Sequence, residues 1–262
     1  HVHPASRPRP LRRGGRGVAE RQPNLAKYLS RCGAASRRAA AELIRSGRVT
    51  VNGEAATDPA RRVEESDAVA LDGRTLSVPE RFIYIMLNKP RGYVCSNADA
   101  HADKLAVELI DRFPGRLLRS AGRLDKESEG LIVFSDDGGY LERAAHPRYM
   151  VAKLYEVTTA REIPEPWLDR MTAGVCDEGE TLRVLEVVPL GGKKYRFKLN
   201  EGRKREIRRL CRAAGAPVES LKRTAMGKLK LGTLAPGDYR ELSPEEVALS
   251  LVPDAAATRP GR

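Results

Sequence analysis

Residues 122–138 read Gly-Arg-Leu-Asp-Lys-Glu-Ser-Glu-Gly-Leu-Ile-Val-Phe-Ser-Asp-Asp-Gly. The second half contains a short apolar run, residues 131–134, that stops at a polar turn, and this pattern predicts a buried strand. The first half places the carboxylate of Asp125 near the guanidinium of Arg123, in a loop bounded by glycines. Loops held by a rigid strand often carry chemistry. Two such charges alone, however, more commonly form a surface ion pair that contributes little to stability.

The length and composition of the chain allow two compact domains. It has 262 residues, of which 41% are hydrophobic, enough for each domain to bury a core. No run approaches the roughly 18 apolar residues of a membrane span, and no basic-then-apolar leader is visible. The four cysteines are far apart and form no Cys-x-x-Cys pair, which argues against a zinc site and fits a reducing compartment. We therefore expect a cytoplasmic protein with neither a membrane partner nor a bound metal.

The charge of the chain points to a polyanionic partner. The net charge is +12 and the isoelectric point is about 9.8, which favours either nucleic acid or an acidic membrane surface. No basic amphipathic helix with large apolar residues is evident, so nucleic acid is the better candidate. Aromatic residues make up 5% of the chain, which argues against a protein that binds single strands without sequence preference by stacking on many rings.

The complete stretch from 122 to 138 resembles the catalytic signature of RNA pseudouridine synthases. The resemblance rests on Gly-Arg-Leu-Asp at 122–125, Ser128, Gly130, the apolar run, and Asp-Asp-Gly at 136–138. The last of these is typical of the RsuA/RluB branch, which modifies ribosomal RNA. The resemblance extends over roughly residues 24–250. It implies that Asp125 is the catalytic carboxylate and that Arg123 helps to hold the target nucleotide out of its helix.

Three further blocks occur in the order that this family has. Leu-Asn-Lys-Pro-Arg-Gly at 87–92 resembles the motif that opens the catalytic domain, and we expect a structural role for it, with Lys89 or Arg91 near phosphate. Lys-x-Tyr-x-Val at 153–157 resembles the block whose tyrosine, here Tyr155, stacks on the target base. Residues 201–209 resemble the third catalytic block, in which the basic residue after isoleucine pairs with the catalytic aspartate; this residue is Arg208. On a helix starting near Arg203, Arg208 falls at the edge of the apolar stripe, where it can lean into a cleft. The family's usual glutamine is Glu206 here.

The sequence pattern of residues 24–76 predicts a small α+β module. Ser36 is a suitable N-cap for the second of two helices, and Asn-Gly at 52–53 and Asp-Gly at 72–73 predict hairpin turns. The order of these features resembles the S-four type RNA-binding module, which was first known in a small-subunit ribosomal protein. A solvated helix face is the usual explanation of exposed basic residues, but the resemblance favours RNA contact. Including the basic residues near the catalytic blocks, the predicted RNA contacts are Lys27, Arg31, Arg37, Arg38, Arg45, Lys89, Arg203 and Arg205.

We therefore predict two α+β domains. The smaller, residues 23–77, binds RNA. The larger, residues 82–250, is the pseudouridine synthase domain, with a mixed, mostly antiparallel sheet, flanking helices and a basic cleft around Asp125, as the resemblance implies. Smaller-scale predictions within it are a helix at 105–113 and a strand at 181–188. The composition of residues 1–22 predicts a disordered basic arm. We also expect residues 253–262 to be a disordered tail.

The implied reaction converts uridine into pseudouridine: the bond from ribose to the ring nitrogen breaks, uracil rotates, and a bond through carbon forms. Nothing is oxidised and no group is imported, so no cofactor is expected. Taking the base out of its stack costs a few kcal/mol, and stacking on Tyr155 would offset roughly 1–3 kcal/mol of it. Asp125 must stay ionised in a cleft, where desolvation raises a carboxylate pKa. Arg208 beside it would oppose that rise.

Two other classes of protein remain at this stage. One is a non-catalytic RNA-binding or ribosome-assembly protein that uses the same basic surfaces. The other is a metal-dependent nuclease that uses Asp125, Asp136 and Asp137. For the enzyme, we expect a monomer that acts on ribosomal RNA, free or in pre-ribosomal particles. Which uridine, which subunit RNA, and whether Asp125 is the nucleophile or the base stay open.

Overall fold

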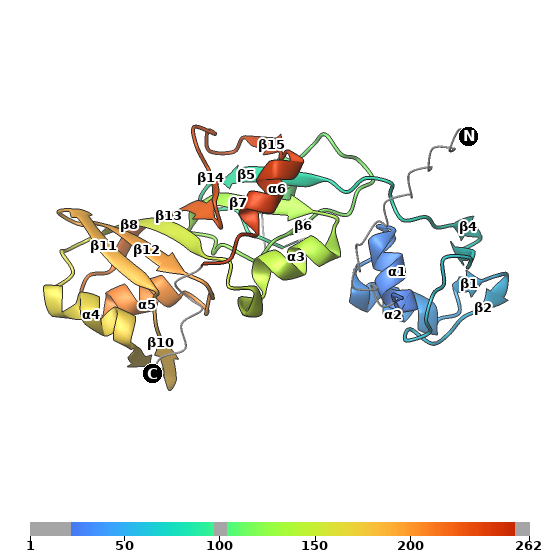
Figure 1. The fold of residues 1–262 in the computed structure, drawn as a ribbon, viewed down its shortest axis with the longest axis horizontal. Coiled ribbons are helices and arrows are strands. Elements are labelled where there is room, and N and C mark those ends of the chain that lie inside the picture. The colour runs from blue at the N-terminus through green and yellow to red at the C-terminus, as the bar shows by residue number, and fades with distance from the viewer. Residues whose placement is uncertain (1–21, 97–103, 255–262) are drawn as a thin grey trace, which may run out of the picture. The chain divides into compact units, whose positions relative to one another are not determined.

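The computed structural model describes residues 22–96 and 104–254 (Figure 1). The predicted basic arm and C-terminal tail lie almost entirely outside these residues. The described residues form two compact units, one of residues 22–30 and 36–77 and one of residues 31–35, 78–96 and 104–254. Within the described residues, no helix is long and apolar enough to cross a membrane.

The N-terminal unit pairs two helices with a four-stranded antiparallel sheet. Ser36 caps the second helix through its hydroxyl, which accepts the N–H of Ala39, as predicted. Both predicted hairpin turns are present: Asn52 and Gly53 have φ of 56° and 85°, the two positive values that a type I′ turn requires. The sheet order is β2-β1-β3-β4. The elements are α1 (Leu25–Arg31), α2 (Arg37–Arg45), β1 (Val49–Val51), β2 (Glu54–Ala55), β3 (Val69–Leu71) and β4 (Arg74–Thr75).

The second unit is built on one large mixed sheet with the order β11-β12-β8-β13-β7-β5-β15, and two short strands pair beside this path. Every pairing in it is antiparallel except that of β13 with β7. The predicted fold class is therefore confirmed. The strands are β5 (Tyr84–Lys89), β6 (Arg119–Ser120), β7 (Glu129–Ser135), β8 (Lys153–Thr159), β11 (Glu186–Gly191), β12 (Lys194–Leu199), β13 (Val218–Met226), β14 (Leu229–Lys230) and β15 (Tyr239–Glu241).

Strand β7 is buried on both faces, which explains its continuous apolar run. Leu131 and Val133 pack in a cluster with residues of α3 and α6, while Ile132 and Phe134 pack with residues of 106–124 on the other face. A third cluster joins β8 and β12 to α4 and α5. The remaining elements are α3 (Gly138–Ala145), α4 (Glu165–Ala173), β9 (Val175–Asp177), β10 (Glu180–Leu182), α5 (Glu206–Ala213), α6 (Pro244–Ser250) and 3-10 turns at Ala106–Leu109 and Pro147–Tyr149.

Three local predictions need correction. The helix predicted at 105–113 is only the 3-10 turn Ala106–Leu109, because the backbone becomes extended at Ile110, with φ of −104° and ψ of 92°. The strand predicted at 181–188 is two strands, since its first part pairs with β9 and its second part with β12. The helix expected to start near Arg203 begins at Glu206, after Arg205 has adopted a left-handed φ of 54°.

Candidate active site

The second unit contains a cavity of about 290 Å³ that is lined by the predicted catalytic residues. Four segments form its wall: the loop before β7, strand β8, the segment that leads into α5, and strand β13. Seven basic and three acidic side chains line it, so its net charge favours an anionic ligand. The basic residues are Arg123, Lys153, Arg203, Lys204, Arg205, Arg208 and Arg223.

Asp125 is half-buried in a loop that is fixed on both sides of it. The N–H of Ser128 donates to the carbonyl of Asp125 at 3.0 Å, and the N–H of Gly92 donates to the carbonyl of Lys126 at 2.7 Å. Leu124, directly before Asp125, is buried. Within the described parts of the chain, the Asp125 carboxylate itself takes part in no hydrogen bond or ion pair. The structure therefore presents an uncommitted carboxylate to the cavity on a well-anchored loop.

Tyr155 and Lys153 reach the cavity from the same face of β8. In the antiparallel ladders Tyr155 lies opposite Phe197 on one side and Arg223 on the other. Lys153 is 8% exposed and Val157 is 2% exposed, while Glu156 between Tyr155 and Val157 is exposed. This alternation agrees with the predicted common face for residues 153, 155 and 157. Burial, together with the neighbouring charge of Arg223, lowers the pKa of the Lys153 ammonium to about 8.

Arg208 contacts the Asp125 loop, but not through the predicted direct ion pair. Its Nη2 donates to the backbone carbonyl of Glu127 at 3.2 Å and lies 3.4 Å from the hydroxyl of Ser128. No Arg208–Asp125 ion pair occurs within residues 22–96 and 104–254. Burial lowers the pKa of Arg208, and Asp125 is among the acids that oppose this shift. The Arg208 guanidinium is therefore near the Asp125 carboxylate, but it hydrogen-bonds to Glu127 and Ser128, two and three residues after Asp125.

Arg223 lines the same cavity and was missed from the sequence. It is 2% exposed, and its Nε donates to the carbonyl of Leu131 at 2.6 Å. Its Nη2 is buried without a hydrogen-bond partner. The signal that could have revealed it is the alternation along β13, where Leu221 and Ala225 flank it on the buried face.

The position of Lys89 supports the structural role predicted for this turn and gives no support to the predicted RNA contact. Lys89 is 0% exposed, and its ammonium donates to the carbonyls of Pro90 at 3.1 Å and Tyr93 at 2.8 Å. It thus fixes the turn after β5 and has no surface of its own to offer to RNA. Lysine is rarely fully buried unless it is paired, and here two backbone carbonyls are the partners. Arg91, two residues further on, is exposed.

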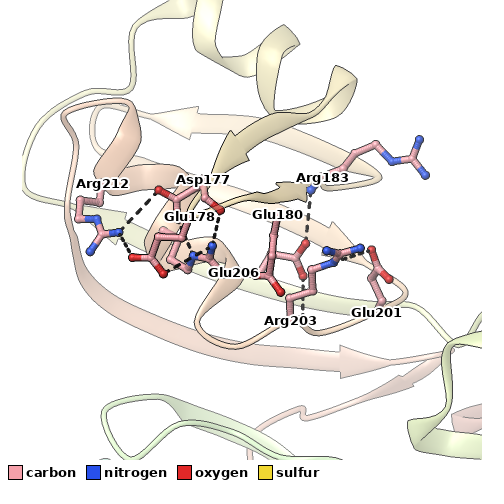
Figure 2. A network of polar contacts seen from close by, with 9 residues as sticks. Asp177, Glu178, Glu180, Arg183, Glu201, Arg203, Glu206 and Arg212 are labelled. Atoms are coloured by element: carbon pink, nitrogen blue, oxygen red, sulfur yellow. Dashed lines mark hydrogen bonds and ion pairs between the residues drawn. The ribbon is translucent and has the colours of Figure 1, made fainter.

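The other basic residues around α5 are exposed or held by acids. Arg123 is exposed at the cavity. Arg205 pairs with Glu127 at 2.7 Å, which lowers the pKa of that glutamate. Arg203 lies 3.7 Å from Glu201 (Figure 2). Both predicted RNA contacts on this segment therefore remain accessible at the cavity, with exposed acidic partners.

The outer side of α5 is attached to the β9–β10 hairpin by ion pairs (Figure 2). Arg209 donates to Asp177 and to Glu180, each at 2.6 Å. Arg212 lies 3.5 Å from Glu178. The helix therefore faces the cavity with Arg208 and the hairpin with Arg209 and Arg212, so this hairpin helps to fix its orientation.

The predicted basic face of the N-terminal unit is present on α1 and α2. Arg37, Arg38 and Arg45 are exposed, and Lys27 and Arg31 are half-buried. None of the five forms an ion pair with a residue that the structure describes. In contrast, Arg48 of the same unit pairs with Asp72 at 2.5 Å. The two helices carry these five basic residues and one acid, Glu42, so they have a net positive charge, as an RNA-binding surface requires.

Glu206, where the family more usually has glutamine, accepts two backbone hydrogen bonds. Its carboxylate takes the N–H of Arg203 at 3.0 Å and the N–H of Arg183 at 3.3 Å, and these contacts are drawn in Figure 2. It is 3% exposed. Burial raises its pKa, and the two backbone donors oppose the rise. Both acceptors are therefore in use, which a carboxylate satisfies and an amide does not.

We expect Glu206→Gln to lower the free energy of unfolding by about 1–3 kcal/mol, because one backbone N–H would then face an NH₂ donor. Urea denaturation of the purified protein measures this, with Glu186→Gln on the exposed edge of β11 as the matched control. A variant as stable as the wild type would mean that Glu206 is already protonated in the folded state, and would contradict the arrangement described above.

The carboxylates that a metal-dependent nuclease would need are used elsewhere. Asp136 accepts the N–H of Ile83 at 2.9 Å and pairs with Arg116. Asp137 caps α3 and accepts the hydroxyl of Tyr84 at 2.8 Å. Among the residues that the structure describes, no three His, Cys, Asp or Glu side chains are grouped as metal ligands. The arrangement gives the nuclease hypothesis no support.

The basic cavity with its carboxylate and the basic helices of the N-terminal unit suit an enzyme that acts on nucleic acid, and comparison with known proteins identifies the family. The profile described as RNA pseudouridylate synthase matches residues 83–213, and the S4 domain profile matches residues 24–69. The chain belongs to the RNA pseudouridylate synthase family, in the RsuA/RluB group, and is a pseudouridine synthase.

Individual relatives cover most of the chain. An uncharacterized RNA pseudouridine synthase of Aquifex aeolicus is 38% identical over 225 residues, which is 85% of this chain and 94% of the relative. Ribosomal large subunit pseudouridine synthase B of Bacillus subtilis is 34% identical (85% and 93% covered), and ribosomal small subunit pseudouridine synthase A of Vibrio parahaemolyticus is 36% identical (85% and 97% covered). A solved pseudouridylate synthase has 29% identity and a TM-score of 0.65, with 87% and 99% covered.

Proposed function

We propose that this enzyme isomerises a specific uridine of ribosomal RNA to pseudouridine, and that Asp125 acts on the ribose of the flipped-out nucleotide. The observation that carries the proposal is the cavity itself. It brings the uncommitted carboxylate of Asp125 together with the ring of Tyr155 in a basic pocket. The volume of about 290 Å³ is near the lower end for small-molecule sites, which suits one nucleotide.

Each lining residue has a role in this proposal. Tyr155 stacks on the extruded base, which offsets roughly 1–3 kcal/mol of the cost of unstacking. Asp125 attacks the sugar or removes a proton from it. Arg208 holds the loop through Glu127 and Ser128, which keeps its positive charge near the Asp125 carboxylate. Arg123, exposed at the cavity, contacts the displaced strand or its phosphates.

Ribosomal RNA is the proposed substrate for two reasons. Two relatives carry the names of ribosomal large and small subunit pseudouridine synthases. In addition, the net positive charge of α1 and α2 suits structured RNA, because phosphate contacts supply most of the affinity of such surfaces. The enzyme therefore acts during ribosome biogenesis, on free RNA or on pre-ribosomal particles.

The test is a map of pseudouridines in ribosomal RNA from cells that lack this protein, with and without a wild-type copy. We expect one position to lose its pseudouridine and to regain it with the wild type. A purified protein that binds ribosomal RNA tightly but never modifies it would favour the non-catalytic assembly protein instead. An unchanged map, together with activity on another RNA in vitro, would contradict ribosomal RNA as the substrate.

Binding by the N-terminal unit makes a separate prediction. Replacing Arg37, Arg38 and Arg45 together by alanine should weaken binding of the substrate RNA about 10- to 100-fold at moderate salt. The slope of log K against log salt should fall by about 2–3, since each lost phosphate contact contributes about 0.7–0.9. Filter binding over a salt series measures both quantities. Arg74→Ala, on the exposed tip of the β3–β4 hairpin, is the control, and an equal loss there would contradict a specific helix face.

A further inference from the structure

Two lysines are buried in the second unit, and they differ in one respect. Lys89, 0% exposed, gives two of its ammonium hydrogens to backbone carbonyls. Lys153, 8% exposed, forms no hydrogen bond or ion pair with any residue of the described chain, although it lines the cavity. The nearby charge that shifts the pKa of Lys153 is Arg223, which is also a cation. Lys89 therefore has a structural role, and Lys153 lacks the contacts for one.

An ammonium group on a side chain that is 8% exposed has lost most of its water, and among the described residues no acceptor replaces it. A hydrophobic side chain of the same length would fit the site at lower free energy. Buried polar groups without partners therefore need a separate explanation, and in a cavity the explanation is a ligand that supplies acceptors. The side of Lys153 that is open faces the cavity, so a molecule bound there can supply the acceptor.

The position of Lys153 on β8 indicates which part of that molecule it meets. Lys153 and Tyr155 are two residues apart on one face of a strand, so their Cα atoms are roughly 7 Å apart. A ring stacked on Tyr155 therefore has an edge within reach of the flexible lysine side chain. Asp125 approaches the cavity from the loop before β7, a different wall. In this arrangement the residues of β8 face the base, and Asp125 on the loop before β7 faces the sugar.

We propose that Lys153 is a further catalytic residue, whose ammonium donates hydrogen bonds to the uracil carbonyl oxygens and stabilises the negative charge that the base carries while it is detached. This inference rests on the proposed function, since it requires a uracil ring stacked on Tyr155. Arg223, buried beside Lys153 with one unpartnered nitrogen, makes the potential of this wall more positive.

The charge arises as follows. When the bond between C1′ and N1 breaks, the electron pair stays on the ring, and its negative charge is shared by N1 and the two carbonyl oxygens. After the ring rotates, C5 forms the new bond to C1′, the C5 hydrogen leaves as a proton, and N1 ends with a proton. Substrate and product have the same atoms, and Lys153 is an ammonium at the start and at the end. No oxidant, reductant or co-reactant is needed.

The test compares Lys153→Met, Lys153→Arg and, as a control, Lys230→Met on the exposed side of β14. The substrate is a transcript that carries the uridine identified by the mapping experiment. We expect Lys153→Met to reduce the single-turnover rate by about 10²–10³-fold, as for the loss of one donor to a developing anion. Its RNA affinity should stay within about threefold of the wild type, and its Tm should be equal or higher. Lys153→Arg should recover about tenfold of the rate.

The outcomes separate this inference from the proposed function. If the wild type forms no pseudouridine, the proposed function fails and Lys153 has no reaction to serve. If the wild type is active and Lys153→Met retains the rate within threefold, only the role of Lys153 is overturned. A Lys153→Met protein that loses Tm in parallel with the rate would also overturn it, because that pattern belongs to a structural lysine.

Discussion

Asp125→Asn should abolish pseudouridine formation, lowering the single-turnover rate by at least about 10³-fold, while the protein stays folded. Asparagine has almost the same shape as aspartate but is neither a nucleophile nor a base under these conditions, and losses of this size are typical when such a group is removed. The Asp125 carboxylate has no hydrogen bond or ion pair to lose within the described chain. The free energy of unfolding should therefore change by no more than about 0.5 kcal/mol.

RNA affinity gives this prediction a second, independent readout. Removing a negative charge from a cavity with seven basic side chains should leave the Kd unchanged or make binding tighter. The matched control is Asp169→Asn on the exposed side of α4, which should keep full activity. A variant of Asp125 that retains a tenth of the wild-type rate would exclude this carboxylate as the reacting group, even if the enzyme itself is a pseudouridine synthase.

Local structure near Asp125 could be read from the sequence because its causes are local. The apolar run of β7 ends at a polar turn, and a strand buried on both faces must be apolar throughout. The Ser36 cap and the Asn52-Gly53 turn were likewise predictable from residue types with specific backbone preferences. In these segments the neighbours in sequence decide the conformation, so no knowledge of distant contacts was needed.

Which residues line the cavity could be predicted only in part. Asp125, Tyr155 and Arg208 are distant in sequence, and a resemblance to a family, rather than any periodicity, brought them together. The resemblance implied a direct Asp125–Arg208 pair, whereas the guanidinium bonds to Glu127 and Ser128. The difference arises from how closely α5 approaches the loop, which depends on tertiary packing and cannot be read from the helix itself.

The buried cations show a different kind of failure. Lys89, Lys153 and Arg223 all lie inside strands, yet a reading based on residue type assigns lysine and arginine to the surface. Alternation of β13 could have identified Arg223 as inward-facing. It could not have revealed whether an inward cation has acceptors, because these are backbone carbonyls or ligand atoms with no signature in the sequence. That distinction is what separates the roles of Lys89 and Lys153.

The second large effect is expected from Gly130→Ala, at the start of β7, where the catalytic loop ends. A Cβ atom there would lie 2.3 Å from the carbonyl oxygen and 2.7 Å from the nitrogen of Arg223. Both atoms are backbone of β13, so no side-chain rotation relieves the contact. Gly130 also has φ of +106°, which L side chains rarely adopt. Overpacking and backbone strain together should lower the free energy of unfolding by on the order of 4 kcal/mol.

Gly115→Ala separates the two contributions. Gly115 has φ of +78°, but nothing lies within 4 Å of its missing Cβ, so this variant carries the backbone strain alone and should cost about 1–2 kcal/mol. Urea denaturation of both variants gives the difference that the close approach of β7 and β13 causes. Equal losses would show that the strands are not as close as the structure has them. A larger loss at Gly130 with low activity of the folded fraction would show, in addition, that the only parallel strand pairing of the described sheet holds Asp125 and Arg223 at their working separation.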